Sequence, residues 1–235
     1  MRGERSGPAD DAVVHVFAAS SCTGVLVDRS LVMTALHCVA RDLQSASSSC
    51  SDGGRPLGAT FGPEGVRVSV GSNIDALEPY AVREIVVGPS RQMCDGDMAL
   101  LVLERPVAGV TPRAVRTEPP TVGSTVTAVG WGVNDYGQYS SQRMRRSGIL
   151  VLGAGGGTVT RAKPDGGVSL VTCGSKEIVT DEGICQGDSG GPLFDAAGAV
   201  AAIVSRVQRG CVGSLSIHSD VSYWRDLSDE ARARQ

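Results

Sequence analysis

The chain has 235 residues, which is long enough for one two-lobed domain with a substantial core. Hydrophobic residues make up 41% and charged residues 20%, and the formal net charge of −3 gives no indication of a nucleic-acid or anionic-membrane partner. No apolar run approaches the roughly 20 residues that a membrane-spanning helix needs.

Short apolar segments, separated by Gly, Pro, Asp and Ser clusters, predict an all-β chain. Strands are expected at 12–18, 24–27, 31–34, 66–70, 81–87, 98–103, 125–129, 148–152, 192–194 and 199–205. The segment 112–120, which is polar and has three prolines, predicts a crossover between two halves. Trp224, Leu227 and Ala231 lie at helical spacing and predict a short C-terminal helix at 222–234.

Seven cysteines indicate an oxidising compartment. No CxxC pair occurs, so neither a zinc site nor a thioredoxin-type motif is expected. Because seven is odd, at most three disulfides form and one thiol remains. Residues 1–11 are polar and charged and contain no signal peptide, so the chain is either cytosolic or a mature form whose leader is missing. The cysteines favour a secreted or extracytoplasmic protein.

Three segments carry residues suited to nucleophilic catalysis. His37 lies at the end of an apolar strand, Asp97 leads into a buried strand, and Ser189 occupies a Gly-rich turn. A serine hydroxyl needs an adjacent base, which histidine provides near neutral pH, and a carboxylate fixes the imidazole tautomer. The glycines around Ser189 allow a substrate carbonyl to approach the N–H groups of Gly187 and Ser189. These two N–H groups are expected to form an oxyanion hole, in which one donor is worth about 3 kcal/mol.

These segments resemble the motifs of the chymotrypsin/trypsin-like serine protease family. Thr-Ala-Leu-His-Cys at 34–38 is similar to the family's TAAHC motif, with Leu for its second Ala, and Asp-Met-Ala-Leu at 97–100 is similar to DIAL. Gly-Asp-Ser-Gly-Gly-Pro at 187–192 is identical to GDSGGP, and 130–132 matches a further GWG signature. The order His, Asp, Ser is also that of the family. The resemblance covers about 13–224, and the loops resemble those of bacterial members.

The resemblance implies two packed antiparallel β-barrels in a single peptidase domain. The first barrel is expected at 12–111, the second at 121–221, and the active site between them. It also implies a serine endopeptidase that works through an acyl-enzyme, with His37, Asp97 and Ser189 as its triad. Protein or peptide substrates and protein inhibitors are the expected partners of a monomer that binds no nucleic acid and no membrane.

Secondary site residues also follow from the resemblance. Ser205 matches the serine that hydrogen-bonds the triad aspartate, and 205–207 would pair with the substrate backbone. Within this segment, Arg206 and Val207 replace the usual Trp and Gly.

The specificity pocket is expected to be lined by Gly183, Ile184 and Gln186 together with 205–207. Gly183 stands where trypsin-like enzymes carry Asp, so a buried Lys or Arg side chain would have no partner there. We therefore expect a preference for small or medium aliphatic side chains. A one-residue slip, which would bring Glu182 to the base of the pocket, remains an alternative.

The resemblance also implies a disulfide framework. Its pairs are Cys22–Cys38 and Cys185–Cys211, with Cys50–Cys94 as the third. The first closes a loop of about 16 residues and is worth roughly 3 kcal/mol. Cys173 is then left over, either as a free buried thiol, which we favour, or in an intermolecular bridge.

The N-terminus departs from the family pattern. Family members expose an Ile or Val whose α-amine pairs with the Asp before the catalytic Ser, here Asp188. The sequence has no Ile or Val followed by Gly-Gly, and Met1 falls near the expected position. The hypothesis is that this chain begins at or next to the activation point. With Met1 in place, the oxyanion hole would be loose and zymogen-like.

His37, Asp97 and Ser189 could each have a purely structural role, because a histidine, an aspartate or a serine is also common at a strand end or in a turn. Their joint occurrence in one order, inside three motifs, argues against coincidence. A non-catalytic homologue of the same fold is one alternative. An esterase is another, since 187–191 also fits G-x-S-x-G, although His37 and Asp97 then stand in the wrong order. No cofactor or metal is expected, but a calcium site in loops of the first barrel stays open.

Overall fold

The structure is a computed structural model, which describes residues 3–42, 50, 54–133, 137–162, 166–181, 184–208, 211 and 213–235. Its strands are β1 (Glu4–Arg5), β2 (Val13–Phe17), β3 (Ser21–Asp28), β4 (Leu31–Thr34), β5 (Ala40–Asp42), β6 (Leu57–Thr60), β7 (Arg67–Val70), β8 (Glu78–Val87), β9 (Ala99–Leu103), β10 (Thr125–Gly130), β11 (Met144–Ala154), β12 (Gly157–Ala162), β13 (Val168–Cys173), β14 (Glu177–Thr180), β15 (Pro192–Phe194), β16 (Val200–Val207) and β17 (Ser216–Asp220). The helices are α1 (Met93–Gly96), a single turn, and α2 (Arg225–Arg232). Short 3-10 helices are Pro8–Asp10, Leu36–Cys38, Pro63–Gly65, Ile74–Ala76 and Val221–Trp224.

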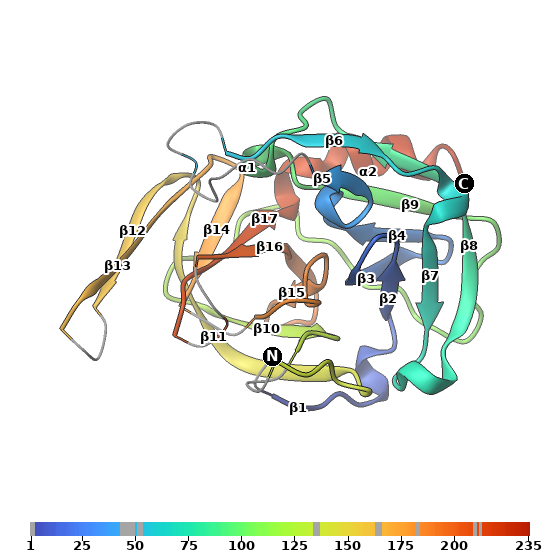
Figure 1. Cartoon of the computed structure of the whole chain (residues 1–235), viewed down its shortest axis with the longest axis horizontal. Coiled ribbons are helices and arrows are strands. Elements are labelled where there is room, and N and C mark those ends of the chain that lie inside the picture. The colour runs from blue at the N-terminus through green and yellow to red at the C-terminus, as the bar shows by residue number, and fades with distance from the viewer. Residues whose placement is uncertain are drawn as a thin grey trace.

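The first half of the chain closes into an antiparallel barrel in the order β2-β3-β4-β9-β8-β7 (Figure 1). The apolar run of β9 is buried along its whole length, because both of its faces are covered. Val14, Leu26, Met33 and Leu100 belong to the buried hydrophobic core that this barrel builds.

The second half forms a sheet in the order β11-β10-β15-β16-β17-β14, which closes because β14 also pairs with β11. Val126, Ile149, Ile178 and Leu193 belong to its core. β1 extends this sheet beside β11, and the β12–β13 hairpin projects from the barrel (Figure 1). The predicted all-β fold of two antiparallel barrels is confirmed.

The predicted strands correspond to observed ones, most with shifted ends; for example, the expected 148–152 is the centre of the longer β11. Between β9 and β10, residues 104–124 form no regular strand, and Val115 makes one isolated parallel bridge to Val200. This stretch includes the expected crossover.

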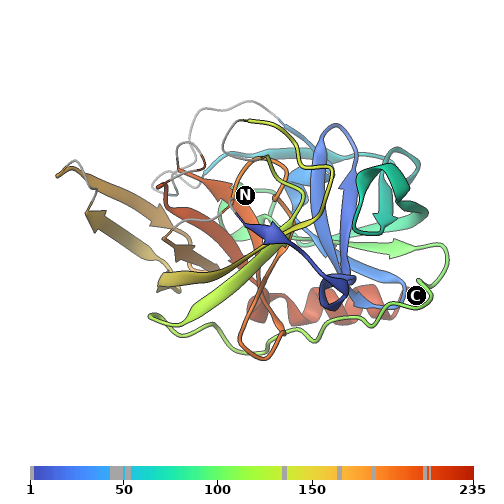
Figure 2. The same ribbon diagram turned by 90° about the horizontal axis from the view of Figure 1, so that it is seen from below.

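The C-terminal helix is present, and it packs against the first barrel although it follows the second. Trp224, Leu227 and Ala231 join the core of the first barrel, and α2 contacts β8 and β9. Figure 2 shows α2 running below the strands. In the described part of the chain, no helix is both long and apolar enough to cross a membrane.

Candidate active site

His37 lies in the 3-10 turn Leu36–Cys38 that follows β4. Its ring Nδ1 donates to Asp97 Oδ2 at 2.8 Å, and its backbone N–H donates to Asp97 Oδ1 at 2.9 Å. Because Nδ1 carries the proton that faces Asp97, Nε2 is the nitrogen left to act as a base. The side chain is 17% exposed, so solvent can reach the ring.

Asp97 follows α1 directly and is fully buried, at the junction of the two barrels. Its carboxylate also accepts the Ser205 hydroxyl from β16 at 2.6 Å, and its carbonyl accepts the Ser219 hydroxyl from β17 at 2.9 Å. Asp97 is therefore held by the first barrel through His37 and by the second barrel through two serines.

The electrostatics of Asp97 follow from these contacts. Burial by itself disfavours the carboxylate, but the His37 ring, the Ser205 hydroxyl and the His37 N–H together hold the pKa of Asp97 below its usual value. The carboxylate is therefore charged at neutral pH, as it must be to fix the imidazole.

Ser189 lies in the turn between β14 and β15, and this turn is fastened to the first barrel. The Ser189 carbonyl accepts the N–H of Thr23 at 2.8 Å, and the Thr23 hydroxyl donates to the Gly187 carbonyl at 2.9 Å. Thr23 follows Cys22, which is disulfide-bonded to Cys38, the residue next to His37. The serine turn and the histidine turn are thus linked through two adjacent residues of β3.

No hydrogen bond of the Ser189 hydroxyl is found among the described residues, and none joins it to His37. Likewise, the N–H groups of Gly187 and Ser189 donate to no acceptor in the described part of the chain. The assignment of Gly187 and Ser189 as an oxyanion hole therefore stays a prediction.

The position of Asp188 explains why residues 130 and 132 of the Gly-Trp-Gly signature are glycines. Its buried carboxylate accepts the N–H groups of Gly132 at 2.8 Å and Cys185 at 2.9 Å. A Cβ on Gly132 would overlap this carboxylate, and one on Gly130 would lie 2.6 Å from Oδ1. Burial raises the pKa of the Asp188 carboxyl, against these two N–H groups. Met1, the expected neighbour in the activation hypothesis, lies outside the described residues.

The predicted substrate-binding residues differ from one another in burial and in contacts. Ile184 packs in the core of the second barrel, Val207 packs against that core, and Gln186 is exposed. Arg206 is buried and pairs with Glu177 of β14. Gly183 and Glu182 fall outside the described residues, so the pocket base stays a prediction.

The structure contains the three expected disulfides, Cys22–Cys38, Cys50–Cys94 and Cys185–Cys211. Cys173 is a free, buried cysteine whose thiol lies 3.5 Å from the Gly157 carbonyl oxygen. Burial raises the pKa of this thiol, which makes it a poor nucleophile.

Two groups of potential metal ligands occur in the described part of the chain: Cys22, His37 and Cys38, and Cys50, Cys94 and Glu177. All four cysteines are disulfide-bonded. A metal binds the thiolate, so neither group suits an ion while these bridges are intact.

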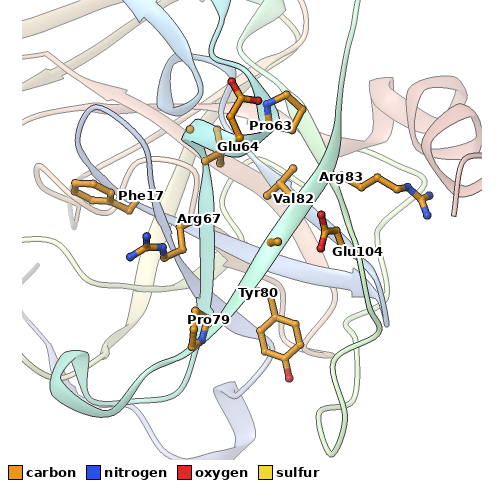
Figure 3. A pocket seen from close by; sticks show the side chains of 12 residues that line it. Phe17, Pro63, Glu64, Arg67, Pro79, Tyr80, Val82, Arg83 and Glu104 are labelled. Carbon is orange, nitrogen blue, oxygen red and sulfur yellow. The ribbon is translucent and has the colours of Figure 1, made fainter.

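A hollow of about 910 Å³ lies on the first barrel, between β7, β8 and the turn Pro63–Gly65 (Figure 3). Phe17, Tyr80 and Arg83 are among its lining residues, and no member of the expected triad is. This hollow is therefore separate from the candidate active site.

Three residues that the sequence analysis did not select support the site: Thr23, Ser219 and Glu177. None belongs to a motif that marks it. Thr23 stands beside a cysteine predicted to pair next to His37, and this was the one available signal.

Comparison with solved structures places the chain in a class. The fold matches that of neuropsin, described as a serine protease expressed in the limbic system of mouse brain, with a TM-score of 0.70 over 98% of this chain and 99% of that one, at 17% identity. The two barrels thus have the chymotrypsin-like arrangement.

Sequence comparison gives the family. The trypsin family model matches residues 3–226, so the chain belongs to the trypsin family of serine proteases. Trypsin eta of Drosophila erecta is 27% identical over 216 residues, covering 88% of this chain and 76% of that protein. Granzyme M of Rattus norvegicus is 26% identical over 81% of this chain and 70% of its own length. A snake venom serine protease of Crotalus durissus durissus is 26% identical over 83% and 70%. These animal proteins lend no support to the expected likeness to bacterial members.

Proposed function

We propose that the protein is a serine endopeptidase with His37, Asp97 and Ser189 as its catalytic triad. The observation that carries the proposal is the fully buried Asp97 carboxylate, 2.8 Å from His37 Nδ1. This contact leaves Nε2 as the basic nitrogen. The fastening of the Ser189 turn to Thr23, one residue from the Cys22–Cys38 bridge, supports the approach of hydroxyl and imidazole.

The proposed reaction has two halves. Ser189 Oγ attacks the peptide carbonyl while His37 Nε2 takes the hydroxyl proton, and His37 then gives that proton to the leaving amine. Water attacks the acyl-enzyme with His37 again as base, which releases the carboxylic acid and restores Ser189. Asp97 stays ionised throughout and stabilises the imidazolium.

Gly187 and Ser189 are proposed to stabilise the tetrahedral oxyanion through their backbone N–H groups. Two donors at about 3 kcal/mol each would account for a substantial part of the rate enhancement. Asp188 is proposed as the activation partner that shapes this loop from beneath, through its bonds to Cys185 and Gly132.

A fluorophosphonate probe tests the proposal directly. Labelling at Ser189 that is lost on denaturation supports the enzyme, and Ser189→Ala should lower kcat by on the order of 10⁶-fold. Ser147→Ala, an exposed serine on β11, is the matched control and should keep kcat within about twofold. Near-normal peptidase activity of the Ser189→Ala protein would refute the assignment.

For specificity, we propose small or medium aliphatic residues on the acyl side of the scissile bond. The support is Gly183 six residues before Ser189, with Val207 beside the core of the second barrel. A peptide library varied at that position should give higher kcat/KM for Ala, Val and Leu than for Lys and Arg. A basic preference would indicate a carboxylate at the pocket base, as in the Glu182 alternative.

An oxidising, extracytoplasmic location is proposed on the strength of the three disulfides, since such bridges are rare in reducing compartments. The proposed partners are protein or peptide substrates.

A further inference from the structure

A buried ion pair lies next to Ser205, the residue whose hydroxyl donates to Asp97 of the candidate triad. Arg206 of β16 binds Glu177 of β14 in a bidentate manner, with Nη1 to Oε1 at 2.6 Å and Nη2 to Oε2 at 2.8 Å. The two side chains are 6% and 1% exposed. Such a pair costs desolvation energy that an apolar pair avoids, so burial alone does not explain its presence.

The guanidinium also contacts the disulfide next to Asp97 and the Ser205 hydroxyl. Nη2 lies 2.9 Å from Cys50 Sγ and 3.5 Å from Cys94 Sγ, so it contacts the disulfide three residues before Asp97. Nη1 donates to the Ser205 hydroxyl at 3.4 Å. The register of β16 against β17 shifts between Val204 and Arg206, and such an irregularity re-aims side chains.

The loop that leads to Asp97 is tied to the turn before β14. Asp95, which has φ +59°, accepts the N–H groups of Lys176 at 2.6 Å and Ser175 at 3.1 Å. Glu177 Oε2 accepts the Gly174 N–H at 2.7 Å. In Figure 1, α1 lies beside the end of β14. The ion pair is thus the inner part of a clamp between this turn and the loop that leads to Asp97.

A hydrogen bond from Arg206 to Ser205 affects where the Ser205 hydroxyl proton points. A serine hydroxyl has one proton, and a guanidinium can only donate. Where Arg206 donates to Ser205 Oγ, the Ser205 proton must point elsewhere, and Asp97 Oδ2 lies 2.6 Å away. Asp97 in turn holds His37.

We propose that Arg206 is a positioning residue, which keeps the Ser205 proton on Asp97 and so fixes the carboxylate that orients His37. Glu177 neutralises and holds the guanidinium for this purpose. The inference rests on the proposed function, in which His37 is the base. It gives the Arg that replaces the family's Trp a role through Ser205 and Asp97.

The test is a double-mutant cycle in the full chain. The variants are R206M/E177Q, which removes both charges, S205A, and the triple combination. We expect R206M/E177Q to lower kcat about tenfold on a peptide substrate with KM within twofold. The triple variant should match S205A within twofold, since Arg206 acts through Ser205. The proposal would be overturned if the kcat loss of the triple variant equalled the product of the losses in R206M/E177Q and S205A. It would also be overturned if R206M/E177Q raised KM and left kcat unchanged.

Two controls separate positioning from stability. In E177Q an amide oxygen remains to accept from Arg206, which can still donate to Ser205, so this variant should lower Tm but keep kcat within threefold; a greater loss of kcat would overturn the proposal. R116M/D195N removes a partly exposed charge pair, 2.8 Å apart, between the crossover and the end of β15. It should leave kcat unchanged. If R206M/E177Q does not fold, R206L/E177Q, which also leaves no donor at position 206, is measured with the same expectations.

A second readout does not need turnover. The His37 Nδ1 proton, bonded to Asp97, can be followed by proton NMR at low field. R206M/E177Q and S205A should shift this resonance alike, and the triple variant should shift it no further; an unchanged resonance in R206M/E177Q would overturn the proposal. Absence of fluorophosphonate labelling at Ser189 in the unaltered chain would instead refute the proposed function, and the resonance would then decide the role of Arg206 by itself.

Discussion

Gly190, immediately after the candidate nucleophile, shows how little room the serine turn has. Its φ is +78°, and a Cβ there would overlap the Thr34 hydroxyl and the Thr23 carbonyl and lie 3.0 Å from the Ala35 N. The residue thus combines a left-handed backbone with a close approach to the strand end that carries His37. Only glycine satisfies both conditions.

Gly190→Ala should therefore lower the free energy of unfolding by about 3 kcal/mol or more, since the backbone cost of about 1–2 kcal/mol is joined by steric overlap. Gly123→Ala is the matched control, because Gly123 has φ +89° with nothing within 4 Å of the added Cβ. It should cost only the backbone term. Urea unfolding of both variants gives the comparison, and equal losses would contradict the steric argument.

At the scale of elements, α2 is a short helix whose stability depends on packing. Eight residues are too few for an isolated helix in water, so its apolar side must be buried. Leu227 and Ala231 provide that side against the first barrel, and the buried Ser228 hydroxyl donates to the Trp224 carbonyl one turn earlier.

Leu227→Ala should lower the free energy of unfolding by about 2–3 kcal/mol, through lost apolar burial and the cavity that remains. Arg225→Ala, at an exposed position of the same helix, should change it by less than about 0.5 kcal/mol. Denaturant unfolding followed by tryptophan fluorescence measures both. A small effect of Leu227→Ala would mean that α2 is dispensable for the first barrel.

At the scale of the whole molecule, the stability depends on pH through buried titratable groups. His218 on β17 is fully buried, with Nε2 2.8 Å from the Thr180 hydroxyl. Burial, with a smaller effect of the Arg206 charge, lowers the pKa of His218 to about 3. The folded protein therefore keeps this ring neutral at pH values where the unfolded chain protonates it.

The direction in which His218 changes the free energy of unfolding with pH follows from its lowered pKa in the folded state. Stability from His218 is complete above its unfolded pKa of 6.5 and falls as the pH drops toward 3, by up to about 1.4 kcal/mol per pH unit. His218→Gln should flatten the dependence of unfolding free energy on pH between 6.5 and 4.5. Asp188 and Asp220, whose carboxyl pKa values burial raises, act with the opposite sign, but they contribute equally to both proteins. Identical slopes for the two proteins would contradict the burial argument.

The strands that the sequence predicted well are those rich in β-branched and aliphatic residues. β4 and β15 agree at both ends, because apolar runs bounded by turn residues mark a buried strand. β17, with the sequence Ser-Ile-His-Ser-Asp, was missed although all five residues are buried. Two of its polar side chains, those of His218 and Ser219, hydrogen-bond to the Thr180 hydroxyl and the Asp97 carbonyl, which lie far away in the sequence.

The residues of the candidate site also fall into two groups, those that a motif marked in the sequence and those that no motif marked. The motifs around His37, Asp97 and Ser189 were recognisable because the chemistry needs particular residues in short fixed contexts. Thr23, Ser219 and Glu177 were not, since each acts through a partner brought near by folding.

The sequence by itself determined the all-β class and the three motif residues, because these depend on local composition and on short motifs. The family resemblance that the motifs carry, and not composition or spacing, implied the two barrels and the disulfide pairs. Only the tertiary structure decided that Ser219 also holds Asp97 and that α2 returns to the first barrel. It also decided that Arg206 turns to Glu177 and Ser205. The reason is physical: a buried charge or hydroxyl is stabilised by whichever complementary group the packing delivers, and that group leaves no periodic signal in the chain.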